Sequence, residues 1–147
     1  MQRKNYDKIM YIRQYANLRK RERELQRELA DIQVEYNTLQ AITYNDAPAS
    51  PDNAHDLSAF IIRKDKQISE ALYQINRIID SYQEIERAVR RVTDLEEQDI
   101  LRLKHMKRYD WKRVAKEMGY SVRQAQRVHG RALEHFEIPG GKDGRMS

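Results

Sequence analysis

Apolar residues recur every three or four positions along most of the chain, which places them on one face of an α-helix. The first such stretch runs from about residue 5 to residue 44 without a Gly or Pro, and predicts one long helix. From Tyr15 onward the spacing alternates between three and four, as in a coiled-coil seam. A helix this long cannot bury its own apolar stripe, so it needs a partner. The seam consists of Tyr15, Leu18, Glu22, Leu25, Leu29, Ile32, Tyr36 and Leu39.

A second stretch with the same spacing runs from about residue 57 to residue 91. Between the two, residues 45–56 contain two Pro and many small polar residues, and predict a linker in which the chain reverses direction. We therefore expect an antiparallel helical hairpin over residues 1–92. The second seam consists of Ile61, Lys64, Ile68, Ala71, Ile75, Ile78, Tyr82, Ile85, Val89 and Val92.

The second seam is wider than the first, because Leu72 and Ile79 lie beside it. A wider apolar stripe indicates more than one neighbouring helix. We therefore expect the hairpin to assemble into a homo-oligomer.

Between residues 93 and 136 the pattern predicts three short helices joined by tight turns. Thr93, with Glu96 three residues later, has the spacing of a capping box at the start of the first helix. Four apolar residues of this helix are expected in a small core: Leu95, Ile100, Leu103 and Met106. The apolar face of the second helix consists of Trp111, Val114, Ala115 and Met118.

The turn before the third helix carries the clearest local pattern. Gly119 ends the second helix, because glycine adopts the left-handed conformation at little cost. Ser121 then begins the third helix as an N-cap, with Gln124 at the capping-box position. Two helices joined this closely predict a helix-turn-helix. The fold class is therefore all-α, with a coiled-coil-like hairpin followed by a three-helix DNA-binding domain over residues 93–136.

The third predicted helix has two chemically different faces. Its inner face would consist of Ala125, Val128, Ala132 and Phe136, and its outer face of Arg123, Arg127, Gly130 and Arg131, flanked by Gln124 and Gln126. Arg can bind guanine O6 and N7 with two hydrogen bonds, and Gln can do the same with adenine N6 and N7. Gly130 costs about 1 kcal/mol relative to Ala inside a helix. Two explanations are open: a crowded neighbour within the protein, or the close approach of a DNA backbone.

Charge supports a nucleic-acid partner. The chain has a formal net charge of +5. Between Arg102 and Arg131 there are ten Lys or Arg residues and two acids, so positive charge is concentrated in the helix-turn-helix. Double-stranded DNA is the partner expected from this distribution.

Other classes of function find little support in the sequence. The chain has no Cys, its four His lack metal-ligand spacing, and no nucleophile is paired with a base, so we expect neither a metal, a cofactor nor an enzyme. His105 and His129 are interpreted as surface residues, with phosphate contact as the alternative. No apolar run is long enough for a signal or a membrane span, which predicts a cytoplasmic protein. Residues 137–147, with Pro139 and three Gly, are expected to be disordered.

The helix-turn-helix resembles region 4 of bacterial sigma factors, which reads the −35 promoter element. The matching residues are Trp111, Val114 and Ala115, the turn from Met118 to Ser121, and the run from Arg131 to Leu133. With its long helical N-terminal part, the whole chain resembles phage and prophage late-transcription regulators of the RinA/ArpU type. The resemblance implies action with RNA polymerase in a bacterial host cell.

The resemblance also implies roles for particular residues. The base-reading positions fall on Val122, Arg123, Gln124, Gln126 and Arg127. Sigma factors often carry charged residues at the first two of these, so Val122 departs from the pattern and the −35 preference does not carry over. Phosphate contacts are expected from Lys112, Arg113, Ser121 and Arg131.

The leading hypothesis is therefore a sequence-specific transcription regulator, an activator of phage late genes. A segment that melts promoter DNA is not apparent, which favours an activator over a complete sigma factor. The alternative is a terminase small subunit, because these phage packaging proteins also combine a helix-turn-helix with helical oligomerisation.

Overall fold

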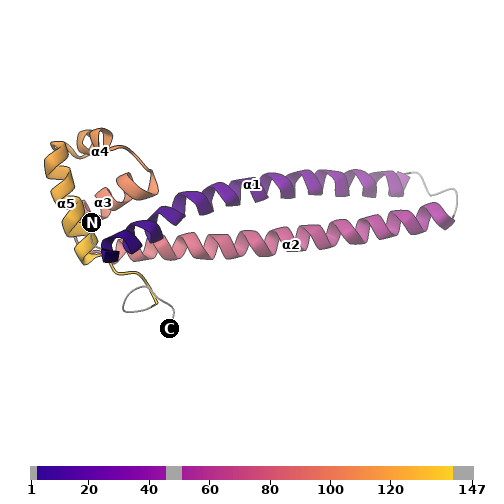
Figure 1. Cartoon of the computed structure of the whole chain (residues 1–147). Coiled ribbons are helices and arrows are strands. Elements are labelled where there is room, and N and C mark those ends of the chain that lie inside the picture. Colours follow the sequence, from indigo (N-terminus) through magenta and orange to yellow (C-terminus); the bar gives the residue numbers. More distant parts are fainter. Residues whose placement is uncertain (1–2, 46–50, 141–147) are drawn as a thin grey trace. The chain divides into compact units, whose positions relative to one another are not determined.

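The structure is a computed structural model of the 147-residue chain, and it describes residues 3–45 and 51–140. Within these ranges the chain is helical, with turns and no strand, so the predicted all-α class is confirmed. No described helix combines the length and the apolar composition that crossing a bilayer requires. Figure 1 shows the elements in chain order: α1 (Arg3–Asn45), α2 (Pro51–Arg90), α3 (Leu95–Leu101), the π-helix η1 (Arg102–Met106), α4 (Trp111–Met118) and α5 (Val122–His135).

The chain divides into two compact units, and each long helix contributes to both. One unit is Lys20–Ile79, which contains the greater part of α1 and α2. The other combines the described residues up to Arg19 with those from Asp80 onward. The boundary expected at residue 92 therefore does not coincide with this division, because both long helices continue into the unit that contains the helix-turn-helix.

In the unit Lys20–Ile79, α1 and α2 pair through the two predicted seams. Leu25 and Leu29 of α1 and Ala71 and Ile75 of α2 form a buried cluster, with Ile68, Ile78 and Ile79 packed against it. An ion pair also joins the helices, with Lys64 Nζ 2.5 Å from Glu35 Oε2. Burial of apolar side chains at the predicted positions explains why these two sequences pair as helices.

The start of α2 differs from the prediction. The helix begins at Pro51, so residues 51–56 are helical instead of part of a linker. Proline is well suited to the first position of a helix, because its missing N–H would have no partner there and its φ is already helical. Residues 46–50 lie outside the described ranges.

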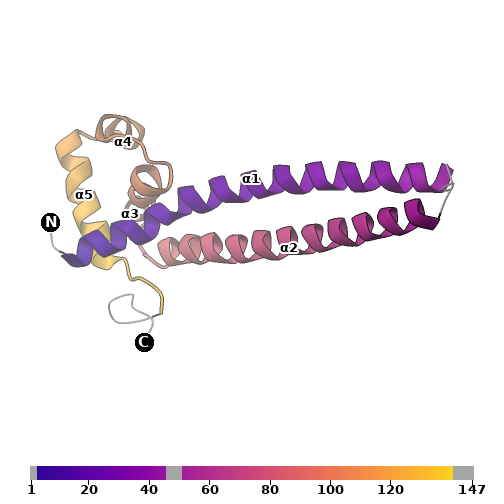
Figure 2. The same cartoon turned by 45° about the vertical axis from the view of Figure 1, so that its right-hand side comes forward.

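The other unit has one apolar core, to which five helices contribute. Ile9 and Ile12 come from α1, and Ile85 and Val89 from α2. In Figures 1 and 2 the indigo start of α1 lies beside α5. Ala88 of α2 and Val92 directly after it are also buried, and the helix-turn-helix supplies the rest of the set: Ile100, Leu101, Val114, Ala115, Ala125, Val128, Ala132, Leu133 and Phe136.

The first helix of the helix-turn-helix starts one residue later than predicted. Asp94, and not Thr93, is the N-cap, and its carboxylate accepts hydrogen bonds from the backbone N–H groups of Glu96 and Glu97. Leu95 is 73 % exposed instead of lying in the core, because five residues at 100° each place it about 140° from the buried Ile100. The core positions of α3 are Ile100, as predicted, and Leu101.

The end of the chain is packed as far as it is described. Ile138 is partly buried against the core, and a turn follows at Pro139 and Gly140. Residues 137–140 therefore have a defined place, contrary to the predicted disorder from residue 137. The remainder of the predicted tail, residues 141–147, lies outside the described ranges.

Candidate nucleic-acid interface

Local hydrogen bonds fix both ends of α4. The carboxylate of Asp110 caps its first turn. At the other end Gly119 has a φ of 72°, in the left-handed region. The N–H groups of Gly119 and Tyr120 donate to the carbonyl oxygens of Lys116 and Ala115, at 3.2 and 2.9 Å. This pairing is a Schellman motif, and it confirms the predicted glycine stop.

The capping box at the start of α5 is also confirmed. The hydroxyl of Ser121 accepts a hydrogen bond of 3.1 Å from the backbone N–H of Gln124. In return, Oε1 of Gln124 accepts a bond of 3.0 Å from the N–H of Ser121. Only Gly119, Tyr120 and Ser121 separate α4 from α5, so their relative direction is set by a short, fully hydrogen-bonded turn.

The two faces of α5 lie as the sequence predicts. Its buried residues are Ala125, Val128, Ala132 and Leu133, and Phe136 directly after it is fully buried. The outer face carries the polar and basic residues. All of the predicted base-reading positions and two further positions are exposed: Val122, Arg123, Gln124, Gln126, Arg127, Gly130 and Arg131.

Three arginines lie on this outer face. Within the described residues, the side chains of Arg123, Arg127 and Arg131 make no hydrogen bond or ion pair. Lys112, which is exposed in the first turn of α4, also makes no hydrogen bond or ion pair with the described residues. Four exposed and unneutralised charges on two adjacent helices favour binding to a polyanion.

Arg113 differs from its neighbour Lys112. Its guanidinium carbon lies 3.7 Å from the centre of the Tyr109 ring, and its Nε lies 3.9 Å from a carboxylate oxygen of Glu117. Stacking on an aromatic ring orients a guanidinium but leaves its edge able to donate. Arg113 can therefore bind a phosphate in a fixed orientation, whereas Lys112 is unconstrained.

The capping box limits what Gln124 can do as a base reader. A bidentate contact with adenine needs both the oxygen and the nitrogen of the side-chain amide. The oxygen of Gln124 is already bonded to the N–H of Ser121, which leaves the NH₂ group. The hydroxyl of Ser121 accepts a bond from Gln124 but keeps its own proton, so it can still donate to a phosphate.

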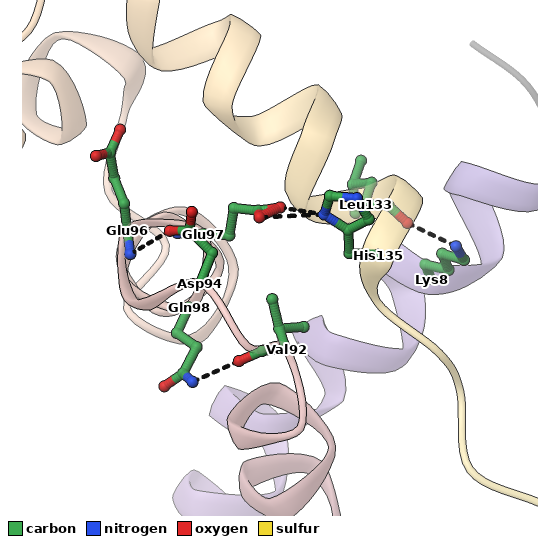
Figure 3. Close-up of polar contacts among 8 residues, drawn as sticks. All are labelled: Lys8, Val92, Asp94, Glu96, Glu97, Gln98, Leu133 and His135. Carbon is green, nitrogen blue, oxygen red and sulfur yellow. Dashed lines mark hydrogen bonds and ion pairs between the residues drawn. The ribbon is translucent and has the colours of Figure 1, made fainter.

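The C-terminal end of α5 is held by charged residues from two other helices (Figure 3). Lys8 of α1, only 6 % exposed, donates from Nζ to the carbonyl oxygen of Leu133 at 2.5 Å. Glu97 of α3 is buried, and its Oε2 lies 3.1 Å from Nδ1 of His135. A cation at a helix C-terminus interacts favourably with the helix dipole, so Lys8 stabilises α5 in its place.

A second polar network supports the middle of α5. His105 of η1 is 2 % exposed, and its Nε2 lies 2.7 Å from Nε2 of His129. Arg13 of α1 donates from Nε to Nδ1 of His105 at 3.2 Å. The ring of Trp111 packs edge-on against His129, with centroids 5.0 Å apart. The interpretation of His105 as a surface residue is therefore wrong: it is a buried link between α1 and α5.

These contacts define the protonation state of the histidine pair. Because Nδ1 of His105 accepts from Arg13, the proton of neutral His105 is on Nε2, which donates to Nε2 of His129. Burial lowers the pKa of His105 to about 3 and that of His129 to about 4, and the charges of Arg13 and Lys104 act in the same direction. Both rings are therefore neutral at pH 7.

Sequence reasoning missed the residues that support α5. Lys8 and Arg13 lie before Tyr15, the first residue of the predicted coiled-coil seam. Ile9 and Ile12 continue the apolar spacing toward the N-terminus and are buried. Their spacing is the one feature of the sequence that marks a buried face in this part of α1.

The described residues contain no group of three or more His, Cys, Asp or Glu that is arranged to hold a metal ion. Comparison of the chain with protein-family models, with curated proteins and with solved structures finds no match in any of the three.

Proposed function

We propose that this chain is a sequence-specific DNA-binding transcription regulator, whose helix α5 enters the major groove of double-stranded DNA. Arg123 and Arg127, near the start of α5, would contact base edges. Lys112, Arg113 and Arg131 would contact phosphates. Helix-turn-helix proteins bind DNA in this way, with the N-terminal part of the second helix facing the bases.

The observation that carries this proposal is the set of unpartnered arginines on one face of α5. Charges of opposite sign three or four residues apart on an exposed helix face can form ion pairs with one another. Here Arg123, Arg127 and Arg131 have no acidic partner within the described residues, although Glu134 follows on the same helix. The opposite face of α5 is fully buried, so the arginines are presented by a rigid element.

The partner and the setting follow from the sequence resemblance. Similarity to sigma region 4 and to regulators of the RinA/ArpU type supports a phage-encoded activator of late genes that acts with host RNA polymerase. We propose the cytoplasm of the bacterial host as its location. We also propose that the hairpin mediates homo-oligomerisation.

Selection of bound sequences from a random pool of double-stranded DNA tests the proposal. The purified full chain should enrich a defined motif, and matches to the motif should lie upstream of late promoters. Addition of the protein to a defined system with host polymerase should then raise transcription. Enrichment of a phage packaging site, without any effect on transcription, would instead identify a terminase small subunit. Failure to enrich any motif would overturn sequence-specific binding.

A further inference from the structure

Gly130 lies in the interior of α5, and nothing in the described part of the chain requires a glycine there. A Cβ atom at this position would meet no heavy atom within 4 Å, so no crowded neighbour excludes a larger residue. The backbone is helical and Gly130 is not among the positive-φ glycines, so an L-residue fits without strain. Glycine nevertheless costs about 1 kcal/mol relative to Ala in a helix interior. A crowded neighbour among the described residues therefore does not explain the glycine, and the close approach of a DNA backbone is the explanation that is left.

The surroundings of Gly130 are those of the candidate DNA interface. At 100° per residue, Gly130 lies within about 60° of both Arg123 and Arg127, on the side opposite Ala125, Val128 and Ala132. It is exposed, and Arg131 follows it directly. The basic face therefore contains one position without a side chain, bordered by guanidinium groups.

We propose that Gly130 is the point at which the sugar–phosphate backbone of bound DNA contacts the main chain of α5. The inference rests on the proposed DNA-binding function and adds the place where the helix meets the wall of the groove. Gly130 is seven residues beyond Arg123, which is about 10 Å along a helix axis. A recognition helix contacts base edges with its N-terminal residues, and the major groove is only about 12 Å wide, so a residue about 10 Å further along the axis can meet the sugar–phosphate backbone that borders the groove.

A missing side chain has a definite use at such a contact. Glycine is the residue that permits another backbone to approach a main chain closely. Without a Cβ at position 130, the deoxyribose and phosphate of one nucleotide can pack against the helix, and Arg131 can bind a neighbouring phosphate. A methyl group at position 130 would push the DNA away from α5 and lengthen every contact that the helix makes.

The test is the pair of variants Gly130→Ala and Gly130→Leu, each measured for thermal unfolding and for DNA binding. Both substitutions should raise the unfolding temperature, because both residues favour helix more than Gly does. Both should weaken binding to selected and to scrambled DNA, and the loss on the selected site should be about tenfold for Ala and more for Leu. The salt dependence of binding should not change, because no charge is lost. Arg131→Ala, by contrast, should lower the salt slope by about one.

Asn76→Ala is the matched control, because it replaces a poor helix former at an exposed position of α2. It should raise stability without changing affinity for DNA. If wild-type protein binds its selected site and both Gly130 variants bind it equally well, the inference is wrong and the proposed function stands. If wild-type protein binds no DNA, the proposed function fails first. A change in sedimentation of Gly130→Leu with unchanged DNA binding would show that a protein surface, and not DNA, approaches α5 here.

Discussion

The Nε2 atoms of His105 and His129 lie 2.7 Å apart, and one proton is shared between them as a hydrogen bond. The pair joins η1 to α5, and Arg13 extends it to α1. Both rings must be neutral for this arrangement, since Arg13 and Lys104 already place positive charge beside them. The position of α5 is thus tied to the protonation state of two buried side chains.

Stability should therefore fall in mild acid. An unfolded His has a pKa of about 6.5, whereas in the folded chain the pKa is about 3 for His105 and about 4 for His129. The unfolded state binds more protons in this interval, so stability is complete above pH 6.5 and declines as the pH falls toward 4. The slope should reach about 1.4 kcal/mol per pH unit for each proton.

Denaturant unfolding of the full chain at several pH values between 4.5 and 7.5 measures this effect. His129→Gln should flatten the profile, because it removes one titrating group while leaving an acceptor for His105. A profile as steep as that of the wild type would show that other groups cause the acid sensitivity.

Lys8→Met should destabilise the protein, although Lys8 is a charged residue near the N-terminus. The substitution leaves the buried carbonyl of Leu133 without its donor, which costs about 1–3 kcal/mol. Lys4→Met is the control, because Lys4 lies one turn earlier and is exposed. Equal unfolding free energies for the two variants, measured in denaturant, would contradict the role given to Lys8.

Loss of Arg127 and loss of Lys112 should affect DNA binding differently, because Arg127 would contact a base and Lys112 a phosphate. Arg127→Ala should lower affinity for the selected site by about 1–3 kcal/mol and abolish the preference over scrambled DNA. Lys112→Ala should weaken binding to both DNAs alike and lower the salt slope by about one. Binding isotherms on both DNAs at two salt concentrations measure these effects. If Arg127→Ala keeps the preference and changes only the salt dependence, Arg127 binds phosphate and another residue reads the base.

Self-association should depend on the exposed apolar side of α2. Leu72 is 44 % exposed, while Ile68 and Ile79 on its flanks are only partly buried. The full chain should sediment as a dimer or larger species. Leu72→Glu should shift it toward monomer without unfolding it, because this side chain is already outside the hairpin core. Gln74→Glu adds a charge at an exposed position on a different side of α2 and serves as the control. A wild-type chain that sediments as a monomer at micromolar concentration would refute oligomerisation.

The parts of the fold that could be predicted from sequence are those determined by near neighbours in the chain. Gly119, Ser121 and Gln124 specify the turn between α4 and α5 within six residues, and the structure has the expected hydrogen bonds. The seams of the long helices were also predictable, because apolar residues spaced alternately three and four apart mark the buried face of a helix whichever helix packs against it. Helix starts were less certain, since Thr93 and Asp94 are both good caps and only packing decides between them.

The supports of the candidate site could not be predicted in the same way. Lys8 and Leu133 are 125 residues apart, and no spacing rule connects them. His105 has a polar side chain, and its burial depends on Arg13 and His129 meeting it from two other helices. Gly130 was visible in the sequence as an anomaly. Only the structure shows that no neighbour crowds position 130, so packing among the described residues does not explain the glycine.

The division of the chain into units has a consequence for the timing of synthesis. The unit that carries α5 is built from two segments of the chain, and the whole of Lys20–Ile79 is synthesised between them. Its core cannot close until Ala132, Leu133 and Phe136 have emerged, because these residues complete the packing around Ile9 and Ile12. A nascent chain that has not yet reached these residues can already pair its long helices, but the core that supports α5 is still incomplete. The pairing of the long helices can therefore precede the closing of the unit that carries α5.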